Sequence, residues 1–122
     1  TVAARPRNKS TNMLNKEFVS LLAADPLQAD VLPVAWVQAM INWFTQFEKL
    51  GPSSLPVNIV QGYEDRTVSF RHNLGVLNNH YKNAAIHIIP KARHHLVNET
   101  SDIYAEIWAW LDDTCDWYNV KN

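Results

Sequence analysis

Two stretches of sequence decide the fold: VNIVQGYEDRTV at residues 57–68 and AAIHIIPKARHH at residues 84–95. Each begins with a short apolar run and turns polar at a glycine or a proline, which is typical of a strand that ends in a loop. We therefore predict strands at 57–61 and 85–89. Between them, four apolar residues recur at helical spacing: Phe70, Leu74, Leu77 and Tyr81. The order strand, helix, strand predicts a βαβ unit, whose right-handed crossover makes the two strands parallel.

Helices are predicted on both sides of this unit. Residues 1–12 are polar and are predicted to be irregular, and an amphipathic helix follows from Leu14 to the break at Asp25-Pro26. A second helix is predicted from Asp30 as its cap, with Pro33 in its first turn, to the Gly51-Pro52 stop. A last helix is predicted from about Thr100 to Trp117.

The second helix has two apolar stripes, where a surface helix normally has one. We expect it to be covered on two sides, either as a central core helix or as a helix between a catalytic core and a mobile lid or acyl pocket. The stripes consist of Trp36, Met40, Trp43, Phe47 and Leu50, and of Val34, Val37, Ile41 and Phe44.

Two parallel strands are few for a sheet of this kind, because parallel sheets usually have several strands and are covered on both faces. The chain also begins with Thr1 and lacks a start methionine. We therefore expect an incomplete α/β fold, namely the end of a parallel sheet whose beginning is missing.

Composition excludes several classes of protein. With 122 residues, 47% hydrophobic and 19% charged, the sequence predicts one soluble globular domain. A net charge of −1 gives no general attraction to nucleic acid. The single cysteine, Cys115, excludes a disulfide scaffold.

Only three glycines and no glycine-rich phosphate loop argue against a nucleotide cofactor, and we expect no cofactor at all. No apolar run reaches the ~20 residues of a membrane span, and we expect a cytoplasmic or peripheral membrane location.

Chemistry-bearing residues follow both predicted strands. In open α/β sheets, ligands bind beyond the carboxyl ends of the strands. Asp65 follows the first strand, while His94 and His95 follow the second. Because neighbouring strands are about 4.8 Å apart, an acid and an imidazole can come within hydrogen-bond reach at this edge.

These residues resemble the α/β-hydrolase superfamily, in particular its monoacylglycerol lipase and lysophospholipase branch. The resemblance lies in Gln61-Gly62-x-x-Asp65-Arg66-x-Val68 after one strand and Pro90-x-Ala92-x-His94-His95-Leu96 after the next. It implies that Asp65 and His94 are the acid and base of a Ser-His-Asp triad. His94 is favoured over His95 because the base of this family is followed, after one residue, by leucine or a similar apolar residue.

The same resemblance implies the organisation of the chain. Residues 1–30 would be a remnant of the cap or lid, and residues 31–122 the C-terminal βαβα portion of the hydrolase core. No Gly-x-Ser-x-Gly elbow is present in the sequence. We therefore expect a C-terminal fragment, inactive alone, of a serine hydrolase that cleaves carboxylic esters, with a lipid-like lysophospholipid or monoacylglycerol as substrate.

Two other functions fit parts of the sequence. His87, His94, His95 and Asp65 have the nitrogen and oxygen atoms that bind metals, although adjacent histidines on an extended loop point apart. Five tryptophans fit a noncatalytic helical module that binds partners through an apolar surface. We also expect the chain to associate with itself, because an unpaired strand edge and the two-striped helix would expose apolar surface.

Overall fold

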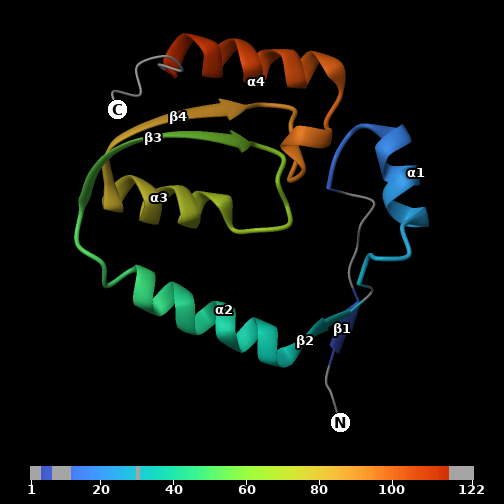
Figure 1. The fold of residues 1–122 in the computed structure, drawn as a ribbon, viewed down its shortest axis with the longest axis horizontal. Helices are drawn as coiled ribbons and strands as arrows, with labels where there is room; N and C mark the ends of the chain where they lie inside the picture. The colour runs from blue at the N-terminus through green and yellow to red at the C-terminus, as the bar shows by residue number, and fades with distance from the viewer. Residues whose placement is uncertain (1–3, 7–11, 30, 116–122) are drawn as a thin grey trace, which may run out of the picture.

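The computed structural model describes residues 4–6, 12–29 and 31–115. Strands and helices alternate along most of the chain (Figure 1). In order, the elements are β1 (Ala4–Pro6), α1 (Lys16–Ala24), β2 (Val31–Pro33), α2 (Val34–Phe47), β3 (Ser53–Gly62), α3 (Phe70–His80), β4 (Tyr81–Ile89), the 3-10 helix η1 (Leu96–Asn98) and α4 (Ser101–Thr114).

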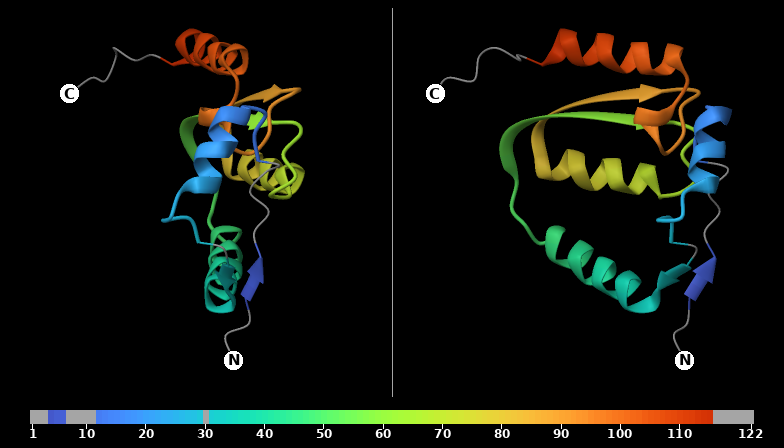
Figure 2. Two further views of the ribbon diagram at one scale, coloured as in Figure 1. Left: turned by 90° about the vertical axis from the view of Figure 1, so that its right-hand side faces the viewer. Right: turned by 45° about the vertical axis from the view of Figure 1, so that its right-hand side comes forward.

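The central unit is the predicted βαβ motif. β3 and β4 pair in parallel, with Val57 opposite Ala84 and Gly62 opposite Ile89. α3 lies on one face of this pair and α4 on the other, as both views in Figure 2 show. The parallel pairing and the incomplete α/β architecture are therefore confirmed. This arrangement places the loops that follow β3 and β4 at the same edge of the sheet.

Both strands begin earlier than the sequence predicted. β3 begins at Ser53 and β4 at Tyr81. The added residues include Pro56, Lys82 and Asn83, which are all exposed and are residue types that strands disfavour. Pairing of the two backbones extends the strands here, while the side chains give no strand pattern.

The apolar core lies between the carboxyl end of β4 and α4. Its buried members are Ile89, Ala92, Ile103 and Ile107. Partly buried Leu14, Val60, Leu96 and Leu111 pack against them. Full burial of each large side chain is worth about 1.5–3 kcal/mol, so this cluster fixes α4 and the loop after β4 relative to the sheet.

The N-terminal segment differs from its prediction as an irregular stretch. β1 pairs antiparallel with β2, with Arg5 opposite Leu32. Such a three-residue ladder forms through backbone hydrogen bonds and needs no apolar pattern. Asn12 and Met13 are buried, so this part of the chain packs against the rest of the fold.

Two helix ends also differ from the prediction. Pro33 is the last residue of β2 and precedes the first turn of α2, because its backbone is extended, with ψ of 137°. Asp30, the predicted cap, lies outside the described residues. The last helix ends at Thr114. Trp117, the predicted end, also lies outside the described residues.

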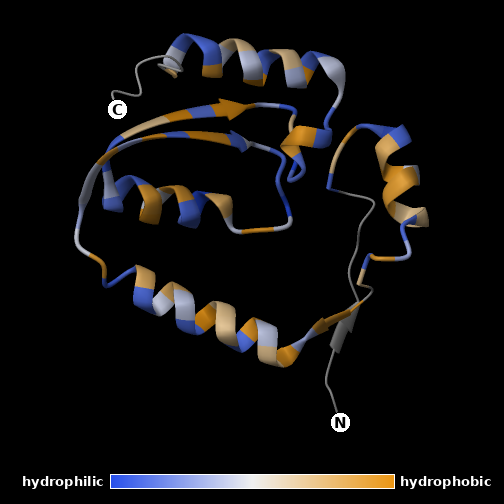
Figure 3. Cartoon of the chain, viewed as in Figure 1, coloured by the Kyte–Doolittle hydropathy of each residue, from blue (hydrophilic) through white to orange (hydrophobic). Residues whose placement is uncertain are grey.

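The predicted cover of the second helix is not found in this structure. α2 lies beyond α3, away from the sheet, and has no buried residue (Figures 1 and 3). The side chains of Trp36 and Trp43 are 53% and 56% exposed. The apolar stripes are present, but their pattern does not say which surface covers them.

We propose that α2 packs against another copy of this chain when the purified protein is concentrated. Exposed apolar area of several hundred Å² is typical of an interface. Sedimentation velocity should show association that increases with concentration in the micromolar range. The double substitution Trp36→Ser and Ile41→Ser should weaken it at least about tenfold, the effect of removing buried apolar area worth about 1.4 kcal/mol. Tyr104→Ser on α4 is the matched control, and a compact monomer at every concentration would contradict the proposal.

Candidate functional site

Two loops meet at the carboxyl edge of the sheet. The acid loop (residues 63–68) follows β3, and the histidine loop (residues 90–95) follows β4. The Tyr63 amide donates to the Ile89 carbonyl and the Glu64 amide to the Ala92 carbonyl, each at 3.0 Å. The sheet ladder thus continues beyond the strands and holds the two loops together.

Gly62 allows this close approach. A Cβ atom at this position would lie 2.4 Å from the carbonyl oxygens of both Ala92 and Arg93. Carbonyl oxygens of the backbone cannot move aside as a flexible side chain can. The glycine is required by the space between the loops, and no positive φ angle is involved.

The loops bring Asp65 and His94 together, as the sequence predicted. The Nδ1 atom of His94 lies 3.0 Å from Oδ2 of Asp65. The Asp65 side chain is 3% exposed and the His94 side chain 33% exposed. The carboxylate is therefore enclosed, while one part of the imidazole remains open to solvent.

Further donors surround the Asp65 carboxylate. Oδ1 accepts from the amides of Thr67 at 2.8 Å and Val68 at 3.3 Å. Oδ2 also accepts from the side-chain amide of Gln61 at 3.3 Å. These bonds fix both oxygens, so the carboxylate presents Oδ2 to His94 in one orientation.

The ionised form of Asp65 is favoured. Burial of the carboxyl group raises its pKa, but the hydrogen bond from His94 and those from Thr67, Val68 and Gln61 together lower the pKa below the ordinary 3.8. A carboxylate can only accept hydrogen bonds, so Nδ1 of His94 must carry the proton of the shared bond. This leaves the lone pair of the neutral ring on Nε2, the nitrogen that can take up a proton.

The two other histidines that the sequence analysis considered, His95 and His87, have different surroundings. The His95 amide donates to the Asn12 carbonyl at 2.9 Å. His87 lies on β4, where its ring stacks on Trp110 and its Nε2 lies 3.1 Å from Glu106. Among residues 4–6, 12–29 and 31–115, no group of three His, Cys, Asp or Glu side chains is placed to hold a metal ion. The predicted alternative of a metal site therefore has no support in the described residues.

Two buried residues near the loops were missed by the sequence analysis. Asn12 belongs to the stretch predicted to be irregular, and its side chain accepts a hydrogen bond from Thr67. Glu99 comes directly before the predicted last helix, and its carboxylate accepts from the amides of Leu14 and Arg93. The one feature of the sequence that could have identified Glu99 is that an acidic residue stands five positions after His94. No feature of the sequence identifies Asn12 as a buried residue.

A nucleophile is not part of this constellation. In the part of the chain that the structure describes, no serine hydroxyl is hydrogen-bonded to His94. Ser53 begins β3 at the opposite end of the sheet, and Ser20 donates to a carbonyl within α1. Within the described residues, the constellation consists of a carboxylate and an imidazole in hydrogen-bond contact.

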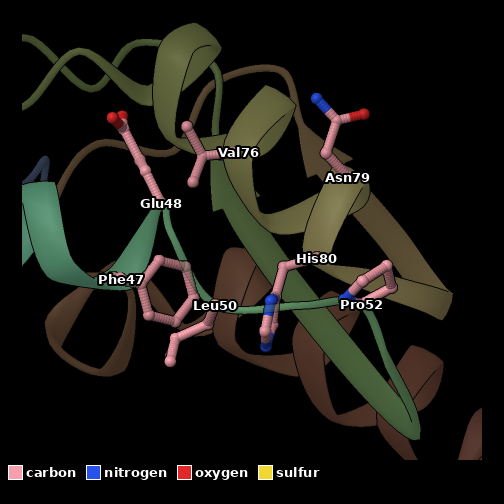
Figure 4. Close-up of a pocket in the computed structure, with 7 residues that line it drawn as sticks. All are labelled: Phe47, Glu48, Leu50, Pro52, Val76, Asn79 and His80. Carbon is pink, nitrogen blue, oxygen red and sulfur yellow. The ribbon is translucent and has the colours of Figure 1, made fainter.

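Two cavities of the described structure lie away from the two loops. One of about 280 Å³ lies where α2 and α3 end and is lined by seven residues (Figure 4). A larger, mostly apolar one of about 400 Å³ lies between α2 and α3. Neither has a lining residue from the acid loop or the histidine loop, so neither can hold a molecule against the Asp65–His94 pair.

Substituting Gly62 should disturb the pair without touching it directly. We expect Gly62→Ala to separate the loops and to destabilise the chain by about 1–3 kcal/mol, the usual cost of overpacking. Gly75→Ala is the matched control, because a Cβ at Gly75 has no atom within 4 Å and alanine favours a helix by about 0.5–1 kcal/mol. Urea denaturation measures both. Equal stability of the two variants would contradict the close approach.

The lowered pKa of Asp65 predicts a pH-dependent contribution to stability. A group with a lowered pKa in the folded state stabilises above its unfolded value, and this contribution is lost as the pH falls through the folded value. We expect Asp65→Asn to reduce stability by about 1.5–3 kcal/mol at pH 7, as for a hydrogen-bonded charge. The difference from the unsubstituted chain should shrink below about pH 4. Thermal denaturation between pH 3 and 7 tests this. Asp113→Asn on the exposed side of α4 should show no such trend.

In the described residues, no helix has the length and apolar character needed to cross a membrane.

No curated protein matches the chain at a significant level. The family model described as serine aminopeptidase, S33, matches residues 3–101, which include β3, β4 and both loops. Because this match covers well over half of the 122 residues and the fold is the α/β fold expected of such an enzyme, the chain belongs to this family of α/β-hydrolases.

Proposed function

We propose that this chain supplies the acid and the base of a Ser-His-Asp triad, with Asp65 and His94 in these roles. The observation that supports this most directly is the 3.0 Å contact between Nδ1 of His94 and the enclosed carboxylate of Asp65. Membership in a hydrolase family adds support. The position of the contact adds further support, because it lies at the edge of the sheet where α/β proteins bind their ligands.

Each residue then has a defined task. Asp65 holds the proton on Nδ1, orients the ring and stabilises the imidazolium that forms during the reaction. Nε2 of His94 takes the proton from the serine hydroxyl as the serine attacks the substrate carbonyl. The same atom returns the proton to the leaving group when the tetrahedral intermediate breaks down.

The serine and its oxyanion hole would come from a part of the protein outside these 122 residues. In this proposal, residues 31–122 form the C-terminal portion of the hydrolase core, and residues 1–30 belong to the cap. The antiparallel pair of β1 and β2 would then tie the cap segment to the start of α2.

We propose a carboxylic ester as the substrate, of the lysophospholipid or monoacylglycerol type. This choice depends on the resemblance of both loops to that branch of the superfamily. The matched family is described as serine aminopeptidase, which makes the amide of an N-terminal amino acid the competing substrate class. The same Asp65 and His94 serve either reaction, because both proceed by acyl transfer.

The test is to extend the gene upstream and to express the complete reading frame. This reading frame should encode a Gly-x-Ser-x-Gly elbow. The encoded protein should react with a fluorophosphonate probe and should hydrolyse monoacylglycerol or lysophospholipid faster than aminoacyl amides. Asp65→Asn and His94→Ala should each lower kcat by about 10⁴, as loss of a triad member does elsewhere.

Three results would contradict the proposal in different ways. Loss of activity with His95→Ala but not with His94→Ala would assign the base to the other histidine. Faster cleavage of aminoacyl amides would replace the ester substrate by a peptide substrate. Absence of probe labelling would favour a noncatalytic module. His72→Ala, on the exposed side of α3, is the control and should keep its activity.

A further inference from the structure

A short segment ahead of α1 contacts both loops of the site. It consists of Asn12, Met13 and Leu14, and we call it the bridging segment. Asn12 is 7% exposed and Met13 1% exposed. Although the sequence placed this segment in or near an irregular stretch, the structure encloses it against the loops that hold Asp65 and His94.

The contact with the acid loop leads directly to the catalytic carboxylate. The hydroxyl of Thr67 donates to Oδ1 of Asn12 at 2.9 Å. The amide of the same threonine donates to Oδ1 of Asp65 at 2.8 Å. One residue, Thr67, is thus held by Asn12 through its side chain and holds Asp65 through its backbone.

The contact with the histidine loop involves the same asparagine. The carbonyl oxygen of Asn12 accepts from the amide of His95, the residue next to His94, at 2.9 Å. Asn12 therefore binds on both sides of the Asp65–His94 pair: its side chain reaches the acid loop, and its backbone reaches the histidine loop.

Glu99 fastens the other end of the bridging segment. Its carboxylate accepts from the Leu14 amide at 2.7 Å and from the Arg93 amide at 2.8 Å, one at each oxygen. The guanidinium of Arg93 adds a longer bond of 3.4 Å to the Met13 carbonyl. Glu99 is 4% exposed, and a buried carboxylate with two amide donors binds them strongly. Arg93 precedes His94, so this bond fixes the backbone from which the imidazole extends.

We propose that Asn12 and Glu99 are positioning residues that hold Asp65 and His94 in register through the bridging segment. The inference rests on the proposed function, because it gives the two residues a role in that same site. Neither residue touches the pair directly: Asn12 acts through Thr67 and His95, and Glu99 acts through Arg93 and Leu14. The segment that leads into α1 thereby controls the geometry of the acid-base pair.

The experiment follows the His94 ring in the 122-residue chain by nitrogen-15 NMR. The ring shifts report which nitrogen carries the proton, and the exchange of that proton with water reports how firmly it is held. In the unsubstituted chain we expect the proton on Nδ1. In Asn12→Ala and in Thr67→Val, its exchange should become about tenfold faster, the effect of losing one hydrogen bond of ordinary strength.

A matched control separates positioning from general stability. Asn15 lies three positions away and caps α1 through its side chain, which accepts from the Phe18 amide at 3.2 Å. Asn15→Ala should cost about 1 kcal/mol of stability and leave the His94 proton unchanged. Equal acceleration in the Asn12 and Asn15 variants would overturn the positioning role, because it would follow from lower stability alone.

The Glu99 arm uses a conservative substitution. Glu99→Gln keeps one acceptor oxygen but turns an amide group toward one of the two backbone donors, so the exchange of the His94 proton should again accelerate about tenfold. Glu106→Gln is the control, because Glu106 contacts His87, which lies on β4. An unchanged His94 proton in Glu99→Gln would remove Glu99 from the proposal.

Asp65→Asn in the same spectra keeps the two proposals distinguishable. Oδ1 accepts from the amides of Thr67 and Val68, so asparagine should turn its amide nitrogen toward Nδ1, and the ring proton should move from Nδ1 to Nε2. A proton that stays firmly on Nδ1 in Asp65→Asn would contradict the acid-base pair itself, and with it both proposals. A firm proton in Asn12→Ala alone would overturn the positioning role and leave the proposed function intact.

Discussion

The contact between Gly62 and the carbonyls of Ala92 and Arg93 is the constraint on which the site depends. It follows from the parallel register of β3 and β4, which sets Gly62 opposite Ile89. Because the two backbones touch at this point, the acid loop and the histidine loop leave the sheet side by side. Asp65 and His94 then need only short loops to meet, although 29 positions separate them in sequence.

The core supports the same edge of the sheet. Ile89, the last residue of β4, and Ala92 of the histidine loop are buried in one cluster with Ile103 and Ile107 of α4. Packing therefore fixes the loop from one side, while hydrogen bonds from the acid loop fix it from the other. This concentration of buried contacts explains why the carboxyl edge is well defined even though α2, at the other side of α3, stays exposed.

The sequence predicted the parts of this fold that leave a local pattern. Short apolar runs that end at Gly62 and Pro90 gave both strands, their order gave the parallel pairing, and their ends placed Asp65 with His94. The early parts of the strands were missed because Pro56 and Asn83 disfavour strands, and only pairing of the backbones places them in the sheet. The two stripes of α2 predict a helix that needs cover, and in the described structure no element buries any of its residues.

Asn12 and Glu99 were beyond sequence reasoning for another reason. Their partners are backbone amides, which nearly every residue possesses, and one threonine hydroxyl. A hydrogen bond between Thr67 and Asn12 leaves no periodicity and no motif at either end. Only the fold that brings these segments together reveals that a polar residue in an apparently irregular stretch is enclosed.

The bridging segment also has a consequence for the order in which the chain folds. The strands of the βαβ unit pair residues 27 positions apart, such as Val57 and Ala84, whereas the bonds of the bridging segment to Thr67 and Glu99 span 55 and 85 positions. Closing such long loops costs more chain entropy and slows folding. During synthesis, Leu14 leaves the ribosome long before Glu99 exists to accept its amide proton. The bridging segment is thus fastened late, and the Asp65–His94 pair reaches its final geometry only when nearly the whole chain is in place.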